Sequence, residues 1–334
     1  MSQEPADYHV VDAVAPAIYT HNFTVQDQDM RSLYEKAKRD QWNASQDIDW
    51  SQSVDPDQGI LPDGLIDIYE TPYWTRLSRK QQLELNRQFS SWRISQLMYG
   101  EEGALLICSQ LATLIPGIDA KFFMATQVMD EARHSEVLAR YLQEKIGVVY
   151  PFNPNLRRLF DLMLETPQWY LKTVGTQLIA ETVAVSLFRM LAEHSPDGLM
   201  REICRRILAD ESRHMGFGML SLPDQVAELS GQERREVEDF TCEALVLSMQ
   251  GQFPQEAYEA VGFNNNEIAE IKQLRHQIAQ KREYMQFRQY FKRDFHSALW
   301  NNLTRTGLLS ERAIERLTSM GVVPPQATTQ TVAA

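Results

Sequence analysis

The motif DEARH at residues 130–134 returns eighty residues later as DESRH at residues 210–214, in a chain with seven histidines. Each copy places a glutamate three residues before a histidine. On a helix, residues i and i+3 project from the same side, so each pair could bind a metal ion. The pairs are Glu131 with His134 and Glu211 with His214. Two solvated helix faces would give the same local pattern, so the surrounding elements must decide between the two interpretations.

Helical periodicity dominates the sequence from about residue 78 onward. Apolar residues recur at three- and four-residue spacing up to Pro116–Gly117 and again after it, which predicts a helical hairpin. A second hairpin is predicted to run through Leu159–His194, with a kink at Pro167, and to return from Gly198 after the turn SPDG. No series of alternating β-branched segments predicts a sheet. We therefore expect an all-α fold.

The two hairpin turns bring two further glutamates to the level of the motifs. Glu131 lies 14 residues after Gly117 and Glu101 lies 16 residues before it, which is about 21 and 24 Å along the two helices. Glu211 and Glu181 lie 13 residues after and 17 residues before the glycine of the SPDG turn. In both hairpins, 30 residues separate the two glutamates. If the hairpins pack as a four-helix bundle, four glutamates and two histidines meet at one level.

The sequence around these glutamates is apolar, as in a protein core. Glu181 is flanked by QLIA and TVAVSLF, and GALLICSQL follows the adjacent pair Glu101 and Glu102. Neighbouring helical residues point about 100° apart, so only one of that pair can face the bundle axis, and the 30-residue spacing favours Glu101. Buried carboxylates are costly unless they are neutralised. Four carboxylates and two imidazoles match two transition-metal ions, with iron or manganese favoured over zinc. The predicted ligands are Glu101, Glu131, His134, Glu181, Glu211 and His214.

Residues beside the motifs are expected to support the ligands. A ligating histidine usually donates its other N–H to a carboxylate, so Asp130 and Asp210 are each expected to serve the histidine of the opposite hairpin. Arg133 and Arg213 could hold these aspartates, or they could be exposed helix charges. The residues one turn from the ligands are candidates for a pocket: Leu105, Gln127, Gln177, Val185 and Ile207. The two amides among them could orient a substrate or a metal-bound water, or satisfy another buried polar group.

Four segments resemble the ligand segments of the ferritin-like non-haem di-iron carboxylate oxygenases and oxidases. They are GEEGA at 100–104, DEARH, the glutamate of AETVA at 180–184, and DESRH. This superfamily includes bacterial methane and toluene monooxygenase hydroxylases, ribonucleotide reductase small subunits and aminobenzoate N-oxygenases. The resemblance covers about residues 80–220 and implies a ferritin-like four-helix bundle with additional flanking helices. It also implies that each hairpin serves one metal ion, with one or more glutamates bridging.

Three positions depart from the patterns of particular relatives. Val185 stands where the methane and toluene enzymes have a threonine, so no role of that hydroxyl can be carried over. Leu138 stands where radical-generating reductase subunits have a tyrosine, which disfavours that activity. Ile207 stands where the aminobenzoate N-oxygenases typically have a third histidine, which disfavours a close match to them.

The resemblance implies an O₂-dependent monooxygenase that oxidises a small or carrier-bound organic substrate. Its cofactor would be two Fe ions, with Mn or mixed Mn/Fe as alternatives, and O₂ would be the co-substrate. No flavin or nicotinamide motif is present, so an external reductase or ferredoxin is expected to supply electrons. The alternatives are an N-oxygenase or desaturase with the same oxidant, and a non-enzymatic ferritin-like iron-binding protein. Storage ferritins are much shorter chains, which favours an enzyme.

Composition sets the class of protein and its partners. A formal net charge of -12 without a basic cluster disfavours nucleic acid, and three cysteines without a CxxC pair fit a reducing cytoplasm. We expect that the protein is not exported and does not span a membrane. By analogy with the superfamily, we also expect a homodimer. The expected division is an N-terminal arm, short helix and long loop at 1–77, the di-metal core at 78–222, additional helices at 223–322, and a disordered tail at 323–334.

Overall fold

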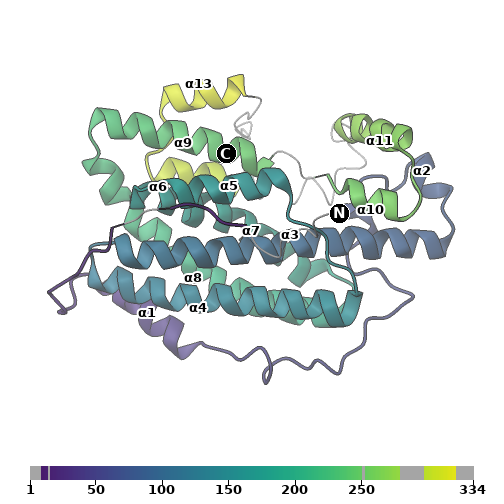
Figure 1. The fold of residues 1–334 in the computed structure, drawn as a ribbon, viewed down its shortest axis with the longest axis horizontal. Helices are drawn as coiled ribbons and strands as arrows, with labels where there is room; N and C mark the ends of the chain where they lie inside the picture. Colours follow the sequence, from purple (N-terminus) through teal and green to yellow (C-terminus); the bar gives the residue numbers. More distant parts are fainter. Residues whose placement is uncertain (1–8, 14–15, 250–252, 279–296, 321–334) are drawn as a thin grey trace, which may run out of the picture.

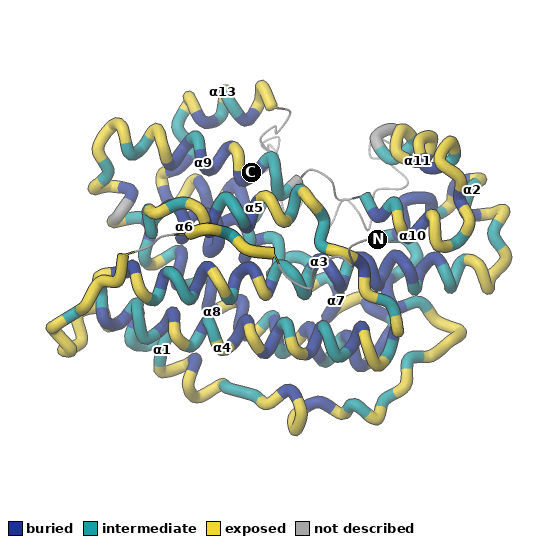
Figure 2. Tube along the Cα trace, in the orientation of Figure 1, coloured by how far each residue is buried: buried dark blue, intermediate teal, exposed yellow. Residues whose placement is uncertain are grey.

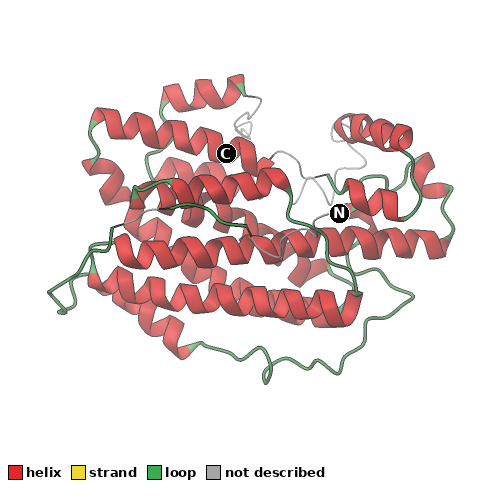
Figure 3. Cartoon of the chain, in the orientation of Figure 1, coloured by secondary structure: helices red, strands yellow, loops and turns green. Residues whose placement is uncertain are grey.

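The structure is a computed structural model that describes residues 9–13, 16–249, 253–278 and 297–320, and its regular secondary structure in those ranges is helical (Figure 1). No strand occurs within those ranges (Figure 3). The all-α prediction is therefore confirmed. The tail expected to be disordered, at 323–334, lies outside the described residues.

Four helices form the centre of the fold as two hairpins. They are α3 (Arg79–Leu114) with α4 (Ile118–Tyr141), and α7 (Glu181–His194) with α8 (Gly198–Glu228). Gly117 precedes the first residue of α4, and Asp197 caps α8 by accepting a hydrogen bond from the backbone N–H of Met200. Ser78 and Gln81 form a capping box at the start of α3. Both hairpin turns therefore lie where the sequence predicts them.

The first arm of the second hairpin is broken, not kinked, at Pro167. α5 (Pro154–Glu165) ends before it, and the chain restarts as α6 (Trp169–Thr173), which continues through the π-helical turn η3 (Val174–Ala180) into α7. The predicted kink is wrong because Thr166, the residue before the proline, is extended with ψ of 130°. α5 is thus a separate helix, and it packs against α3.

Two glycines let α5 approach the core closely. A Cβ atom at position 103 of α3 would lie 2.3 Å from the ring of Phe160 on α5, so Gly103 is required for this approach. Gly175 in η3 has the same role toward Met163, which a Cβ would meet at 2.5 Å. α5 is therefore docked over the middle of α3 and over η3.

Further elements cover the core. α1 (Gln28–Arg39) packs against α4 and α8. The others are η1 (Asp63–Leu65), α2 (Pro72–Thr75), η2 (Leu142–Ile146), α9 (Gly231–Met249), α10 (Gln255–Ala260), α11 (Asn265–Ile278) and α13 (Glu311–Ser319). The expected boundary at residue 222 falls inside α8, which continues past Pro223 to Glu228. The division into core and additional helices remains a prediction.

Two apolar clusters fill the bundle, one on each side of a polar layer. Along α3 the order is Phe89 in one cluster, then the polar layer, then Ile107 in the other cluster. Along α4 the order is reversed, from Phe123 to Leu138. Figure 2 shows buried positions along the length of both helices. The charged residues at mid-height are thus shielded from solvent at both ends.

One helical segment within the described residues, Trp169–His194, is long and apolar enough by composition to cross a membrane, with a mean hydropathy of 1.3. Most of it is buried inside the bundle. It also carries Glu181 in its middle, in the polar layer. These features are those of a buried core helix.

Candidate metal centre

The structure brings the six predicted ligand residues together in two overlapping groups. One group is Glu101, Glu131, His134 and Glu211, and the other is Glu131, Glu181, Glu211 and His214. In each group, one ligand atom per residue lies within 4.8 Å of all the others. All six side chains are buried, whereas the competing Glu102 is exposed. Glu131 and Glu211 belong to both groups.

Both histidines turn the same ring nitrogen toward the carboxylates. Nδ1 of His134 lies 3.1 Å from Oε2 of Glu101, and Nδ1 of His214 lies 3.7 Å from Oε1 of Glu181. Each Nδ1 also faces Glu131 and Glu211, at 3.1 to 3.4 Å. One proton cannot bond to three acceptors equally, whereas a metal ion accepts several ligands at once. Nδ1 is therefore the nitrogen available to a metal.

The two shared glutamates each divide their oxygens between the two histidines. Glu131 presents Oε2 to His134 and Oε1 to His214, and Glu211 presents Oε1 to His134 and Oε2 to His214. Oε1 of Glu211 is buried and makes no hydrogen bond among the described residues. A bridging carboxylate between two cations would have this orientation. The donor set therefore fits a pair of metal ions.

The other ring nitrogen of each histidine contacts an aspartate of the opposite hairpin. Nε2 of His134 lies 3.0 Å from Oδ2 of Asp210, and Nε2 of His214 lies 3.2 Å from Oδ2 of Asp130. Burial is the largest single effect and would raise the pKa of each aspartate, but the hydrogen bond with its histidine and the charge of that histidine together lower the pKa. Ionised carboxylates only accept hydrogen bonds, so both Nε2 atoms carry the proton and both Nδ1 atoms are left to the centre.

Two arginines hold the aspartates from the outer side. Arg133 donates to Oδ1 of Asp130 at 2.5 Å and to Oδ2 of Asp210 at 2.9 Å, and it is almost fully buried. Arg213 donates to Asp210 and lies 3.8 Å from Oδ2 of Asp130. Both arginines are therefore placed inside the network, not on a solvated helix face.

The carboxylates are too crowded to be charged together without cations. The pKa values of Glu101 and Glu181 are raised well above the usual value. Burial is the main cause, and the negative charge of Glu211 is the second. Burial alone would lower the pKa of His134, but its hydrogen bonds to Asp210 and Glu101 and its close contacts with Glu131 and Glu211 raise it well above its usual range. Protons thus take the place of cations when no metal is bound, and metal binding must release them.

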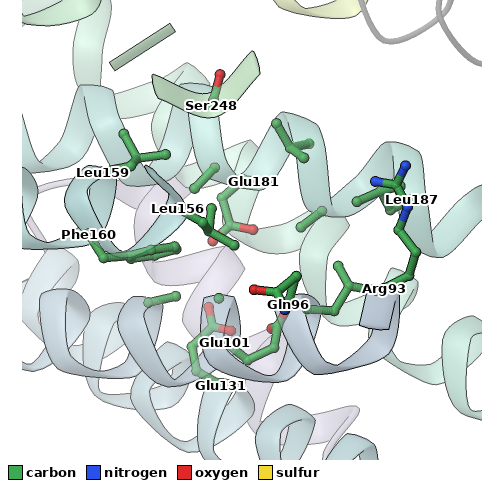
Figure 4. Close-up of a pocket in the computed structure, with 16 residues that line it drawn as sticks. Arg93, Gln96, Glu101, Glu131, Leu156, Leu159, Phe160, Glu181, Leu187 and Ser248 are labelled. Atoms are coloured by element: carbon green, nitrogen blue, oxygen red, sulfur yellow. The ribbon is translucent and has the colours of Figure 1, made fainter. Parts of the chain in front are cut away.

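An apolar pocket opens onto the carboxylates. It has about 740 Å³ of empty space, its open mouth included. Three of the predicted ligands reach it, because Glu101, Glu131 and Glu181 form part of its lining. Figure 4 shows them between Leu159 and Phe160 on one side and Arg93 and Leu187 on the other. An organic molecule in this pocket would lie directly against the candidate metal centre.

The sequence profile of the family described as P-aminobenzoate N-oxygenase AurF matches residues 24–294. The chain belongs to this family. The resemblance inferred from the four ligand segments is thereby confirmed, and this N-oxygenase family member is an oxidoreductase of the di-metal oxygenase type. Among curated protein sequences, none matches it significantly.

Solved structures share its fold. An R2-like ligand-binding oxidase with aerobically reconstituted Mn/Fe cofactor is 21% identical, with a TM-score of 0.53 over 87% of this chain and 99% of that chain. An R2-like ligand-binding oxidase with aerobically reconstituted metal cofactor after photoconversion has a TM-score of 0.51 at the same identity and coverage. Likeness at this identity shows the fold, which is the ferritin-like bundle that the sequence predicts.

The family match includes Ile207, the position that disfavoured a close match to the aminobenzoate N-oxygenases in the sequence. Ile207, in the place of a third histidine, is fully buried and lies within the matched range. A family member can therefore carry an aliphatic residue there. Ile207 therefore does not argue against membership of the aminobenzoate N-oxygenase family.

The five residues expected to form a pocket do not line the pocket in this N-oxygenase family chain. Those residues are Leu105, Gln127, Gln177, Val185 and Ile207. All except Leu105 are buried in the bundle interior. The pocket instead opens between α3, α5 and α7, because α5 docks over the ligand level as a separate helix.

Sequence spacing missed two residues that complete the aspartate network. Nε1 of Trp42 donates to Oδ2 of Asp210 at 2.8 Å, and Nε2 of Gln41 donates to Oδ1 of Asp130 at 3.0 Å. The guanidinium of Arg133 lies 4.6 Å from the Trp42 ring centroid and donates to Oε1 of Gln41 at 2.6 Å. Both residues follow α1, and the docking of α1 against α4 and α8 brings them in, so no local pattern marks them.

Proposed function

We propose that this protein is an O₂-dependent di-iron oxygenase that oxidises an organic molecule held in the apolar pocket. The observation that carries the proposal is the set of two ligand groups, each with one histidine and three glutamates, which share Glu131 and Glu211. The pocket opens onto these groups from one side. Family membership supports the same class of reaction. We expect it to act in the cytoplasm, with a homodimer as the expected assembly.

The proposed ligands divide evenly between two ions. Glu101 and His134 would hold one ion, Glu181 and His214 would hold the other, and Glu131 and Glu211 would bridge them. Such an ion pair, when bound and reduced, supplies the electrons and the Lewis acidity that activate dioxygen. A donor set of carboxylates and imidazoles favours iron or manganese over zinc, so two Fe ions are proposed, with Mn/Fe as the alternative pairing.

The chain's own residues hold the centre and exclude water from it. Asp130 and Asp210 fix the tautomer of each imidazole, so that Nδ1 stays directed at the ions. The apolar walls formed by Leu159, Phe160 and Leu187 keep water from the substrate beside the centre. Monooxygenation consumes two further electrons per turnover, for which we propose an external reductase or ferredoxin.

N-oxygenation is the second candidate for the reaction, and the family match favours it. It would use the same ligands and the same pocket, and would differ only in presenting a nitrogen instead of a carbon to the oxidant. Carrier-bound substrates and desaturation remain alternatives within the same chemistry. Iron binding without an organic substrate is the less favoured proposal, because an apolar pocket against the carboxylates has no use in it.

The test combines metal content with oxygen consumption. Protein loaded with Fe(II) under nitrogen should hold about two ions per chain and, on exposure to oxygen with a chemical reductant and a panel of arylamines and hydrocarbons, should consume O₂ faster with one class. Product mass spectra distinguish N-oxidation from C-hydroxylation. Two bound irons with oxygen uptake that no organic compound accelerates or converts would favour an iron-oxidising protein and refute the oxygenase.

A further inference from the structure

Gln127 ties together ligand residues from both hairpins. It is fully buried on α4, one turn before Glu131. Its Nε2 donates to Oε1 of Glu131 at 3.0 Å and to Oε1 of Glu181 at 2.8 Å. This contact with Glu181 is shorter than the 3.7 Å from the same oxygen to Nδ1 of His214. The amide is therefore closer to that carboxylate oxygen than the histidine is.

The orientation of this amide is dictated by its surroundings. When metal binding has released the protons of the glutamates, their carboxylates only accept hydrogen bonds, so the N–H end of Gln127 faces them and its carbonyl faces away. There it accepts a hydrogen bond from Nε2 of Gln177 at 2.9 Å. Oε1 of Gln177 is left buried without a partner among the described residues. The fold tolerates that unpaired acceptor and keeps both N–H groups of the Gln127 amide directed toward the glutamates.

The backbone fixes Gln177 in place. It lies in the π-helical turn η3, four residues before Glu181, and α8 passes very close to it. A Cβ at position 218 of α8 would lie 2.6 Å from Cβ of Gln177, so Gly218 is required for this approach. Gln177 is thus clamped between α8 and α4, and through it Gln127 is clamped as well.

The amide pair serves only one side of an otherwise symmetric centre. Both oxygens that Gln127 contacts face His214, since Oε1 of Glu131 lies 3.3 Å from Nδ1 of that histidine. The position equivalent to Gln127 in the other hairpin is Ile207, and the position equivalent to Gln177 is Leu97. Aliphatic side chains cannot donate hydrogen bonds. The carboxylates at His134 therefore have no corresponding amide.

We infer that Gln127, held by Gln177, is a positioning residue that makes the two metal positions unequal, by preorganising Glu181 and Glu131 for the ion at His214. This inference rests on the proposed di-metal function, and it adds that the two positions differ in their affinity for a metal ion. The His214 position binds its ion more tightly than the His134 position, because its carboxylates are already held in place before the ion arrives. Removing the amide selectively weakens the His214 position.

The test isolates each position in the full-length protein. Glu101→Gln disables the His134 position and leaves the His214 position, and Glu181→Gln does the reverse. Gln127→Met is then added to each background, and Co(II) is titrated while its visible absorption is followed. We expect the affinity to fall by about 10- to 100-fold in the Glu101→Gln background and by less than about 2-fold in the Glu181→Gln background.

Two controls separate the possible failures. Circular dichroism verifies that each variant folds. If Gln127→Met does not fold, Gln177→Met replaces it, because Gln177 touches no ligand; it should lower the Co(II) affinity in the Glu101→Gln background by a smaller factor. Equal losses in both backgrounds, or no loss in either, overturn the inference while leaving a two-ion wild type and the proposed function standing. A wild type that binds no Co(II), Mn(II) or Fe(II) overturns the proposed function and this inference together.

Discussion

Replacing Glu131 should remove both metal ions, whereas replacing Glu101 should remove one. Glu131 gives one oxygen to each histidine, while Glu101 lies near His134 alone. The changes Glu131→Gln and Glu101→Gln keep the size of the side chain and remove its charge. Elemental analysis after Mn(II) loading should give about two ions per chain in the wild type, about one in Glu101→Gln and close to none in Glu131→Gln, as the sharing of ligands requires.

The same difference should appear in thermal stability. An ion that binds only the folded chain, at a free concentration about 100-fold above its dissociation constant, adds about 2.7 kcal/mol. Unfolding entropy of about 2.1 cal/mol/K per residue gives about 0.7 kcal/mol/K for 334 residues, and hence about 4 °C per ion. Calorimetry with and without Mn(II) should therefore show metal-induced shifts of about 8, 4 and 0 °C for wild type, Glu101→Gln and Glu131→Gln. Equal metal content and equal shifts in the two variants would refute the shared role of Glu131.

Three further predictions concern the surroundings of the centre. Asp130→Asn should weaken Co(II) binding at His214 by about 10- to 100-fold, and an unchanged affinity would contradict the orienting role of that carboxylate. Ala184→Phe, in the pocket wall, should keep two ions but abolish substrate-dependent O₂ uptake; uptake at the wild-type rate would place the substrate elsewhere. Burial lowers the pKa of Lys172 to about 8 from about 10.5, so its burial penalty is complete below about pH 8 and decreases as the pH rises. Urea denaturation should then show the wild type gaining stability relative to Lys172→Met from about pH 7 to about pH 9.5, and a constant difference would mean that the buried amine stays charged.

The sequence predicted those parts of the site that depend on distances along helices. The turns at Gly117 and at the SPDG segment set the heights of Glu101 and Glu181 relative to the two motifs, because helical rise is constant. That geometry needs only regular helices and short turns, and the structure has regular α-helix between each glutamate and its turn, in α3, α4, α7 and α8. The meeting of the six side chains at one level therefore follows from counting residues.

The parts that escaped the sequence depend on how separate elements dock. Pro167 ends a helix that periodicity alone would continue, and the freed α5 then forms a pocket wall through Phe160 and its fit against Gly103. Trp42 reaches Asp210 only because α1 packs across two core helices. Neither contact can be predicted from residue spacing, because each joins residues that are far apart in the chain and depends on how their side chains fit together.

The crossed pairing of aspartates and histidines also has an evolutionary consequence. Asp130 of the first hairpin holds His214 of the second, and Asp210 holds His134, so neither hairpin contains a complete half of the centre. Two copies of a motif are usually free to diverge, but here a change in either copy alters the partner's histidine. We therefore expect homologous chains to change the two copies in concert, with loss of one aspartate accompanied by replacement of its histidine, 84 residues away for Asp130 and 76 residues away for Asp210.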